Sequence, residues 1–190
     1  MVELRKTAIA GLAVTHAAPD GAAAQKFNPT ILIHGMLGNR HHFENLQRMF
    51  AMWGRPSVAI DLPGHGESQN VFDDISIDFH VQSVNKVVRA YDDQVDLVGH
   101  SMGGLIAAKV AECCRGRIGA LGLFCPAPPR WVLLRGKIWK RIWRREYLEP
   151  IFWTGNEFRI RREDAQALMF NNVFPPDPWL DELVPESGRA

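Results

Sequence analysis

The residues best suited to chemistry in this sequence lie in the short segment 99–103, GHSMG. The segment fits the pattern G-x-S-x-G. It follows a short run at 94–98, QVDLV, that is typical of a buried strand, and it precedes 105–111, whose composition favours a helix. A serine on such a strand-to-helix turn is held away from the backbone with its hydroxyl exposed. The segment therefore predicts Ser101 as a nucleophile.

Acyl transfer also needs hydrogen-bond donors for the oxyanion, and the sequence offers two backbone candidates. The N–H of Met102 lies one residue past the serine, at the start of the expected helix, where the elbow geometry places one donor. A second donor is expected from the loop after an earlier strand, and the N–H of Met36 follows the apolar run 30–33. The residues that support these two loops are His34, Gly35, Gly99, His100 and Gly103.

Composition restricts the classes of protein that the chain can represent. The 190 residues are 46% hydrophobic and 23% charged with a net charge of +1, which predicts one ordinary globular unit with no general affinity for nucleic acid. No apolar run is long enough to cross a bilayer and the first residues make a poor signal peptide, so we expect a cytoplasmic protein. The cysteines at 113, 114 and 125 match no metal motif and are expected to be reduced core residues. Neither a metal nor an organic cofactor is implied.

Expected strands and helices alternate along the first two thirds of the chain. The strands are expected at 8–14, 30–33, 57–60, 94–98 and 121–124, and the helices at 43–52, 77–91 and 105–111. Alternation of this kind predicts an α/β fold, with a mostly parallel sheet covered by helices on both faces.

The composition changes at Arg130. Residues 130–162 hold ten Lys and Arg against three Glu, and the apolar residues at 134, 138 and 142 recur at helical spacing. We therefore expect a core at 1–129 and a helical lid at 130–190 that contains a basic amphipathic helix. A cap helix with solvated charges is favoured over one that lies on anionic lipid as a peripheral membrane contact.

Three motifs together make the chain resemble the α/β-hydrolase-fold serine hydrolases. They are HGMLG at 34–38, DLPGHGES at 61–68 and GHSMGG at 99–104. Within that superfamily the chain is most similar to the monoacylglycerol lipase and esterase branch. The resemblance implies the first six core strands of a doubly wound sheet, with a lid inserted after Phe124. Asp61, Glu67 and His65 of the second motif are expected to shape and satisfy their turn.

The resemblance also implies a triad acid and a triad histidine further along the chain. Both would follow core strands that should come after Ala190, so we expect the C-terminal core strands to be missing and the chain to be truncated. The strand that ends at Phe124 would then leave an open sheet edge, through which the chain could self-associate. Of the seven histidines, His41 and His42 are the least implausible substitutes for the base.

These observations predict a serine hydrolase that cleaves carboxylic esters through an acyl-enzyme on Ser101. The expected partner is a small-molecule ester with an acyl chain, such as a monoacylglycerol. Two alternatives stay open. One is a non-catalytic binding protein that keeps the pocket and lacks the base, and the other is a hydrolase of C–C bonds that uses the same serine.

Overall fold

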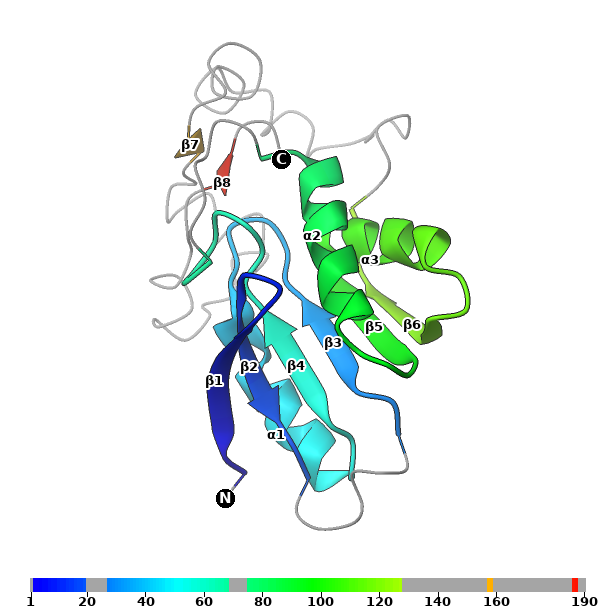
Figure 1. Ribbon diagram of the computed structural model, residues 1–190. Coiled ribbons are helices and arrows are strands. Elements are labelled where there is room, and N and C mark those ends of the chain that lie inside the picture. The colour runs from blue at the N-terminus through cyan, green and yellow to red at the C-terminus, as the bar shows by residue number, and fades with distance from the viewer. Residues whose placement is uncertain (1, 20–26, 69–74, 128–156, 159–185, 188–190) are drawn as a thin grey trace.

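The computed structural model describes residues 2–19, 27–68, 75–127, 157–158 and 186–187 (Figure 1). Its strands are β1 (Leu4–Ile9), β2 (Leu12–Ala17), β3 (Thr30–Ile33), β4 (Ser57–Ile60), β5 (Val95–His100), β6 (Ile118–Phe124), β7 (Glu157–Phe158) and β8 (Glu186–Ser187). Its helices are the 3-10 helix η2 (Arg40–Phe43) and the α-helices α1 (Glu44–Met52), α2 (Ile77–Arg89) and α3 (Met102–Cys113).

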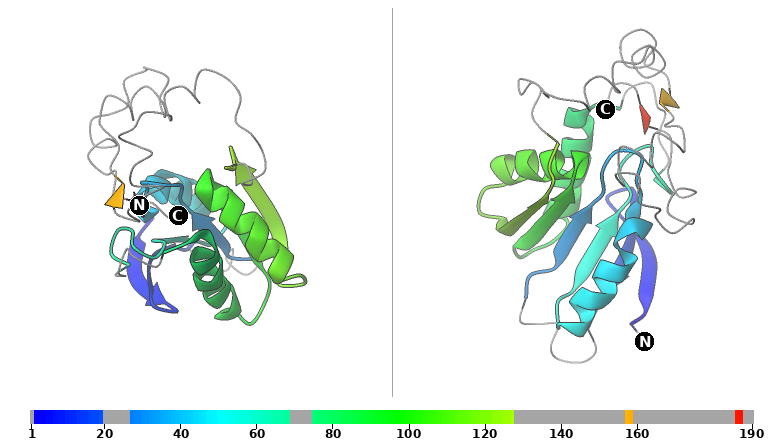
Figure 2. Two further views of the ribbon diagram at one scale, coloured as in Figure 1. Left: turned by 90° about the horizontal axis from the view of Figure 1, so that it is seen from above. Right: turned by 180° about the vertical axis from the view of Figure 1, so that it is seen from behind.

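The first six strands form one sheet in the order β1-β2-β4-β3-β5-β6. The β1–β2 and β2–β4 pairs are antiparallel, and the β4–β3, β3–β5 and β5–β6 pairs are parallel. Helices α2 and α3 cover one face and α1 covers the other (Figures 1 and 2). All four residues of β3 and of β4 are buried, as expected of central strands with helices on both faces. The doubly wound, mostly parallel sheet predicted from the sequence is confirmed.

The beginning of the chain differs from the sequence prediction. A single strand was expected at 8–14, but β1 and β2 form a hairpin in which Ile9 pairs with Leu12. The two residues of the turn, Ala10 and Gly11, have φ angles of 51° and 86°. A two-residue hairpin turn of this handedness usually carries Asn-Gly or Asp-Gly. Because alanine stands at the first position here, the sequence does not predict the turn.

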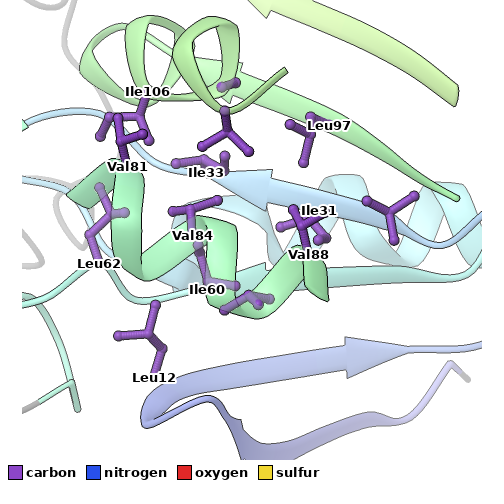
Figure 3. Close-up of a cluster of buried hydrophobic side chains, with 14 of the residues drawn as sticks. Leu12, Ile31, Ile33, Ile60, Leu62, Val81, Val84, Val88, Leu97 and Ile106 are labelled. Atoms are coloured by element: carbon purple, nitrogen blue, oxygen red, sulfur yellow. The ribbon is translucent and has the colours of Figure 1, made fainter. Parts of the chain in front are cut away.

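One continuous hydrophobic cluster fixes α2 and α3 on the sheet (Figure 3). Val81, Val84 and Val88 of α2 recur at helical spacing and pack against the strands, and Ile106 of α3 joins the same cluster. Val84, Val88 and Ile106 are fully buried, and each side chain of this kind stabilises the fold by roughly 1.5–3 kcal/mol. The cluster holds the N-terminus of α3, and therefore the turn before it, firmly against the sheet.

The two edges of this sheet differ in chemistry. β1 exposes Arg5 and Lys6, and charged side chains of this kind discourage pairing with another strand. β6 has the sequence IGALGLF, and its side chains Leu121, Leu123 and Phe124 are 41%, 43% and 55% exposed. Among the strands that the structure describes, β6 is therefore an uncharged apolar edge, at the position where the sequence predicted one.

The expected role of the cysteines as core residues is wrong for two of the three. Cys114 is buried, whereas Cys113 and Cys125 are exposed and all three are free thiols. Cys113 lies in the last turn of α3, and Cys125 directly follows the edge strand β6.

The expected lid at 130–190 lies outside the described residues, apart from the short antiparallel pair β7 and β8. In the described part of the chain, no helix combines the length and the apolar character needed to cross a membrane.

Candidate active site

Ser101 occupies the turn between β5 and α3, as the sequence predicted. Its φ and ψ angles are 53° and −119°, and the residue is half-buried. The turn depends on the glycines around it. A Cβ added to Gly99 would lie 2.2 Å from the carbonyl oxygen of Gly103, and one added to Gly103 would lie 2.2 Å from the carbonyl oxygen of Ile33. Only glycine at these two positions lets the elbow close against β3.

Three neighbouring strands of the sheet end in strained backbone. β3, β5 and β6 are followed by Leu37, Ser101 and Cys125, whose φ angles are 61°, 53° and 44°. Positive φ at a residue other than glycine costs about 1 kcal/mol or more and concentrates at functional sites. Backbone hydrogen bonds stabilise the arrangement, because the N–H of Ser101 donates to Phe124 at 3.0 Å and the N–H of Ala127 donates to Ser101 at 2.8 Å. The backbone by itself therefore marks this end of the sheet as a candidate site.

The two expected oxyanion donors both belong to segments that adjoin Ser101. Met102 is the first residue of α3, where backbone N–H groups have no partner within the helix. Met36 follows Gly35, and a Cβ added to Gly35 would lie 2.9 Å from Cβ of Ser101. Among the hydrogen bonds of the described residues, none uses the N–H of Met36 or of Met102. Both amides thus belong to residues next to Ser101 or to Gly35, which adjoins it, and neither amide is engaged in that part of the chain.

His34 joins the loop after β3 to the loop after β4. It is buried, its Nδ1 donates to the carbonyl of Gly35 at 2.8 Å, and its Nε2 accepts from the N–H of Leu62 at 3.0 Å. Burial, followed by repulsion from His65, holds the pKa of His34 well below its usual value. His34 is therefore a neutral structural residue that orients Gly35.

Two further histidines, His65 and His80, form a row of ring contacts that runs from His34 into the core. The ring of His65 lies 4.9 Å from that of His34 and 5.9 Å from that of His80. Nδ1 of His65 donates to the carbonyl of Pro63 at 3.0 Å, a satisfied turn of the kind the sequence predicted. His80 is fully buried, neither of its ring nitrogens has a hydrogen-bond partner within the described residues, and burial lowers its pKa to about 3. Within the described residues, none of the three hydrogen-bonds to Ser101.

Asp61 is the centre of a buried polar network. Its carboxylate accepts the N–H of Arg40 at 2.7 Å and the N–H of Glu67 at 2.8 Å, and it forms an ion pair with the Arg40 guanidinium. The same guanidinium contacts the Glu67 carboxylate at 2.6 Å and, by hydrogen bonding to it, lowers the pKa of Glu67. A Cβ added to Gly66 would lie 2.2 Å from Asp61 Oδ2, so glycine is required there. The predicted turn-forming role is confirmed for Asp61, whereas the exposed Glu67 carboxylate pairs with Arg40 and Lys6. The Arg40 partner was not predicted, since Arg40 lies 21 residues away.

The substitutes proposed for the base are not bonded to the nucleophile. Nδ1 of His41 pairs with the Glu44 carboxylate at 2.7 Å, and the ring of His42 lies against Gly38. Within the described ranges, no hydrogen bond joins the Ser101 hydroxyl to a histidine. In the same part of the chain, no three residues among His, Cys, Asp and Glu are grouped to hold a metal ion.

Comparison with known proteins agrees with this geometry. A family model described as the alpha/beta hydrolase fold matches residues 28–159, which is more than half of the chain. The chain belongs to this family.

Named relatives cover only part of the chain, and the chain covers only part of them. It is 32% identical over 145 residues to 2-succinyl-6-hydroxy-2,4-cyclohexadiene-1-carboxylate synthase of Serratia proteamaculans, covering 64% of this chain and 54% of that protein. It is 39% identical over 82 residues to pimeloyl-[acyl-carrier protein] methyl ester esterase of Neisseria meningitidis, covering 42% and 29%. The chain thus spans about half or less of the length of these curated relatives.

Solved structures confirm the fold. An extracellular alpha/beta-hydrolase from a Paenibacillus species superposes with a TM-score of 0.68 at 18% identity, covering 84% of this chain and 66% of that one. The family is thus shown by the family model, and the relatives within it include a protein named as an esterase and one named as a synthase.

Proposed function

We propose that the chain carries the nucleophilic half of a serine esterase. The Ser101 hydroxyl attacks the ester carbonyl, and the N–H groups of Met36 and Met102 bind the oxyanion. The alkoxy group then leaves with a proton, and water releases the acid from the acyl-enzyme. A general base must carry the serine proton to the leaving alcohol. The described residues hydrogen-bond no histidine to Ser101, so the proposal assigns the base to residues beyond them.

A single observation carries the proposal. Ser101 is held at a φ of 53° on a turn that is half-exposed, beside two backbone amides that no described residue engages. A buried structural serine has no need of such strain. Each oxyanion donor typically lowers the barrier by about 3 kcal/mol, so two of them are a large share of the catalytic effect.

Apolar surface beside the serine favours an ester with an acyl chain. The Met36 side chain is 43% exposed next to its own N–H, and Phe124, whose carbonyl accepts from Ser101, is 55% exposed. The esterase among the relatives is named for a pimeloyl methyl ester, which also combines a carboxylic ester with an acyl chain. The proposed substrate is therefore a lipid-like carboxylic ester.

A second candidate function rests on the Serratia relative, which is a synthase by name and matches a larger part of this chain than the esterase does. A serine in this geometry could also serve a reaction at a C–C bond, and both candidates need a reactive Ser101. A non-catalytic binding protein needs only the pocket.

The deciding experiment is covalent labelling. The full chain is incubated with a fluorophosphonate and, separately, with p-nitrophenyl esters of graded acyl length, and the adduct is located by mass spectrometry. We expect one adduct on Ser101, which Ser101→Ala abolishes and which Ser83→Ala on the surface of α2 leaves intact. Labelling without ester turnover would favour the C–C reaction. A folded sample that forms no adduct would support the binding protein.

A further inference from the structure

The turn that carries the Met36 amide is bracketed by two imidazole rings. The turn runs from Gly35 to Gly38, whose N–H donates to the Gly35 carbonyl at 3.1 Å. A Cβ added to Gly38 would lie 3.0 Å from Nδ1 of His42, and one added to Gly35 would lie 3.2 Å from Nδ1 of His100. One ring therefore lies against each end of the same turn. In the sequence, His100 is only a member of the nucleophile motif and His42 only a candidate substitute for the base.

The turn needs external support because its own backbone is strained. Leu37, at its third position, has a φ of 61° while its side chain is fully within the core at 2% exposure. Leucine disfavours this region, and such a conformation persists only where the surroundings impose it. His34 supports the turn at the Gly35 carbonyl from one direction. The rings of His42 and His100 supply contacts at both of its glycines.

Both rings act as neutral groups at pH 7. Burial, followed by repulsion from His100 and His41, lowers the pKa of His42 to about 4, and burial lowers the pKa of His100. Two uncharged rings, one against each end of the turn, provide shape and rigidity to it without competing for the charge on an oxyanion.

We infer that His42 and His100 are positioning residues that hold the Gly35–Gly38 turn so that the Met36 N–H points at the oxyanion formed on Ser101. The inference rests on the proposed function. It adds a specific role for two side chains from different elements, η2 and β5, that touch the turn and not the substrate. A misplacement of a catalytic group by about 1 Å can cost on the order of 100-fold in rate, so loss of either ring should be measurable.

The first test separates binding from chemistry in the reaction of the full chain with a fluorophosphonate. Saturation kinetics give an inhibition constant and a maximal rate of modification of Ser101. We expect His42→Ala and His100→Ala to lower the maximal rate by roughly 10- to 100-fold with little change in the inhibition constant. His42→Phe, which restores a neutral ring, should recover most of the rate. His16→Ala, a half-buried histidine of β2 remote from the turn, is the matched control and should react as the wild type does.

The second test does not depend on reactivity. Hydrogen exchange at the Gly38 N–H reports how firmly the turn is closed, and we expect protection to fall at least tenfold in His42→Ala while amides in α2 stay protected. If the wild type forms no adduct, the proposed function fails, and exchange at Gly38 still decides whether the rings hold the turn. Unchanged exchange, or unchanged maximal rates in both folded alanine variants, would overturn the inference.

Discussion

Two loops at the same end of the sheet use their polar groups in opposite ways. The loop after β4 buries Asp61, which accepts from two backbone N–H groups and from the Arg40 guanidinium. In the turn after β5, the Ser101 hydroxyl and the Met102 N–H make no hydrogen bond within the described residues. Both loops need glycines at positions where a Cβ would meet other atoms at 2.2 Å.

The difference separates residues that stabilise the site from those that can react in it. A buried polar group whose bonds are all made contributes to the free energy of unfolding, and removing one partner is costly. A group that is left unbonded contributes little to stability and is available to a ligand. Asp61 is therefore a structural residue, whereas the proposed function gives Ser101 a chemical role, although both belong to motifs that resemble the same family.

The largest effect on stability is expected for Asp61→Ala. The substitution leaves the Arg40 guanidinium, whose side chain is 1% exposed, without its buried partner, which should lower the free energy of unfolding by about 3–5 kcal/mol. Glu67→Gln is the matched control, since its side chain is 58% exposed and should cost less than about 1 kcal/mol. Urea denaturation of the three proteins gives the values. Equal losses of unfolding free energy in the two variants would contradict the view that Asp61 is the main partner of the buried Arg40 guanidinium.

A smaller loss is expected for Gly103→Ala in the elbow. The new Cβ would meet the Ile33 carbonyl oxygen at 2.2 Å, and displacement of backbone should cost about 3 kcal/mol and move Ser101. Gly116→Ala tests backbone conformation without a clash, because Gly116 has a φ of 88° and open space around it. It should cost only about 1 kcal/mol. Thermal melts and labelling of Ser101 would be compared. A Gly103→Ala protein as stable and reactive as the wild type would refute the close approach.

Acid should destabilise the fold through the buried histidines His34 and His80. The folded pKa of His80 is about 3 and that of His34 is well below its usual value, while both titrate near 6.5 when unfolded. As the pH falls below about 6.5 only the unfolded state gains these protons. Each histidine then removes about 1.4 kcal/mol of stability per pH unit until its folded pKa is reached.

The variant His80→Leu isolates one of these contributions. Its free energy of unfolding should decline less steeply between pH 6.5 and 4, by about 1.4 kcal/mol per pH unit. At pH 7 it should be no less stable than the wild type, because both ring nitrogens of His80 lack a partner within the described residues. Parallel pH profiles for the two proteins would show that His80 takes up its proton in the folded state.

The smallest effect on the free energy of unfolding is expected for Ser101→Ala, which we compare with Ser68→Ala. Ser68 donates to the Asp61 carbonyl at 2.8 Å and accepts from the N–H of Ala13 at 2.9 Å, so Ser68→Ala should cost about 1–2 kcal/mol. Ser101→Ala should change the free energy of unfolding by less than about 0.5 kcal/mol while it abolishes labelling. Denaturation curves measured side by side test the contrast. A Ser101→Ala protein that is as destabilised as Ser68→Ala would mean that the hydroxyl is structural.

The sequence by itself predicted most elements of the sheet and the turn between strand and helix that carries Ser101. The apolar runs of β3 and β4, the valine spacing of α2 and the glycines around Ser101 are local signals, because periodicity and turn chemistry depend on neighbouring residues. The β1–β2 turn was missed, since its first residue, Ala10, is not one that a left-handed turn usually selects.

Only the tertiary structure decided which distant side chains meet. The order of the strands brings β5 beside β3 and so places the loop with Met36 against Ser101. The same packing pairs Arg40 with Asp61 and brings the rings of His42 and His100 against one turn. Except for His42, which is four residues from Gly38, these contacts join positions more than 20 residues apart. Their formation depends on how the sheet and helices pack, which no local pattern in the chain encodes.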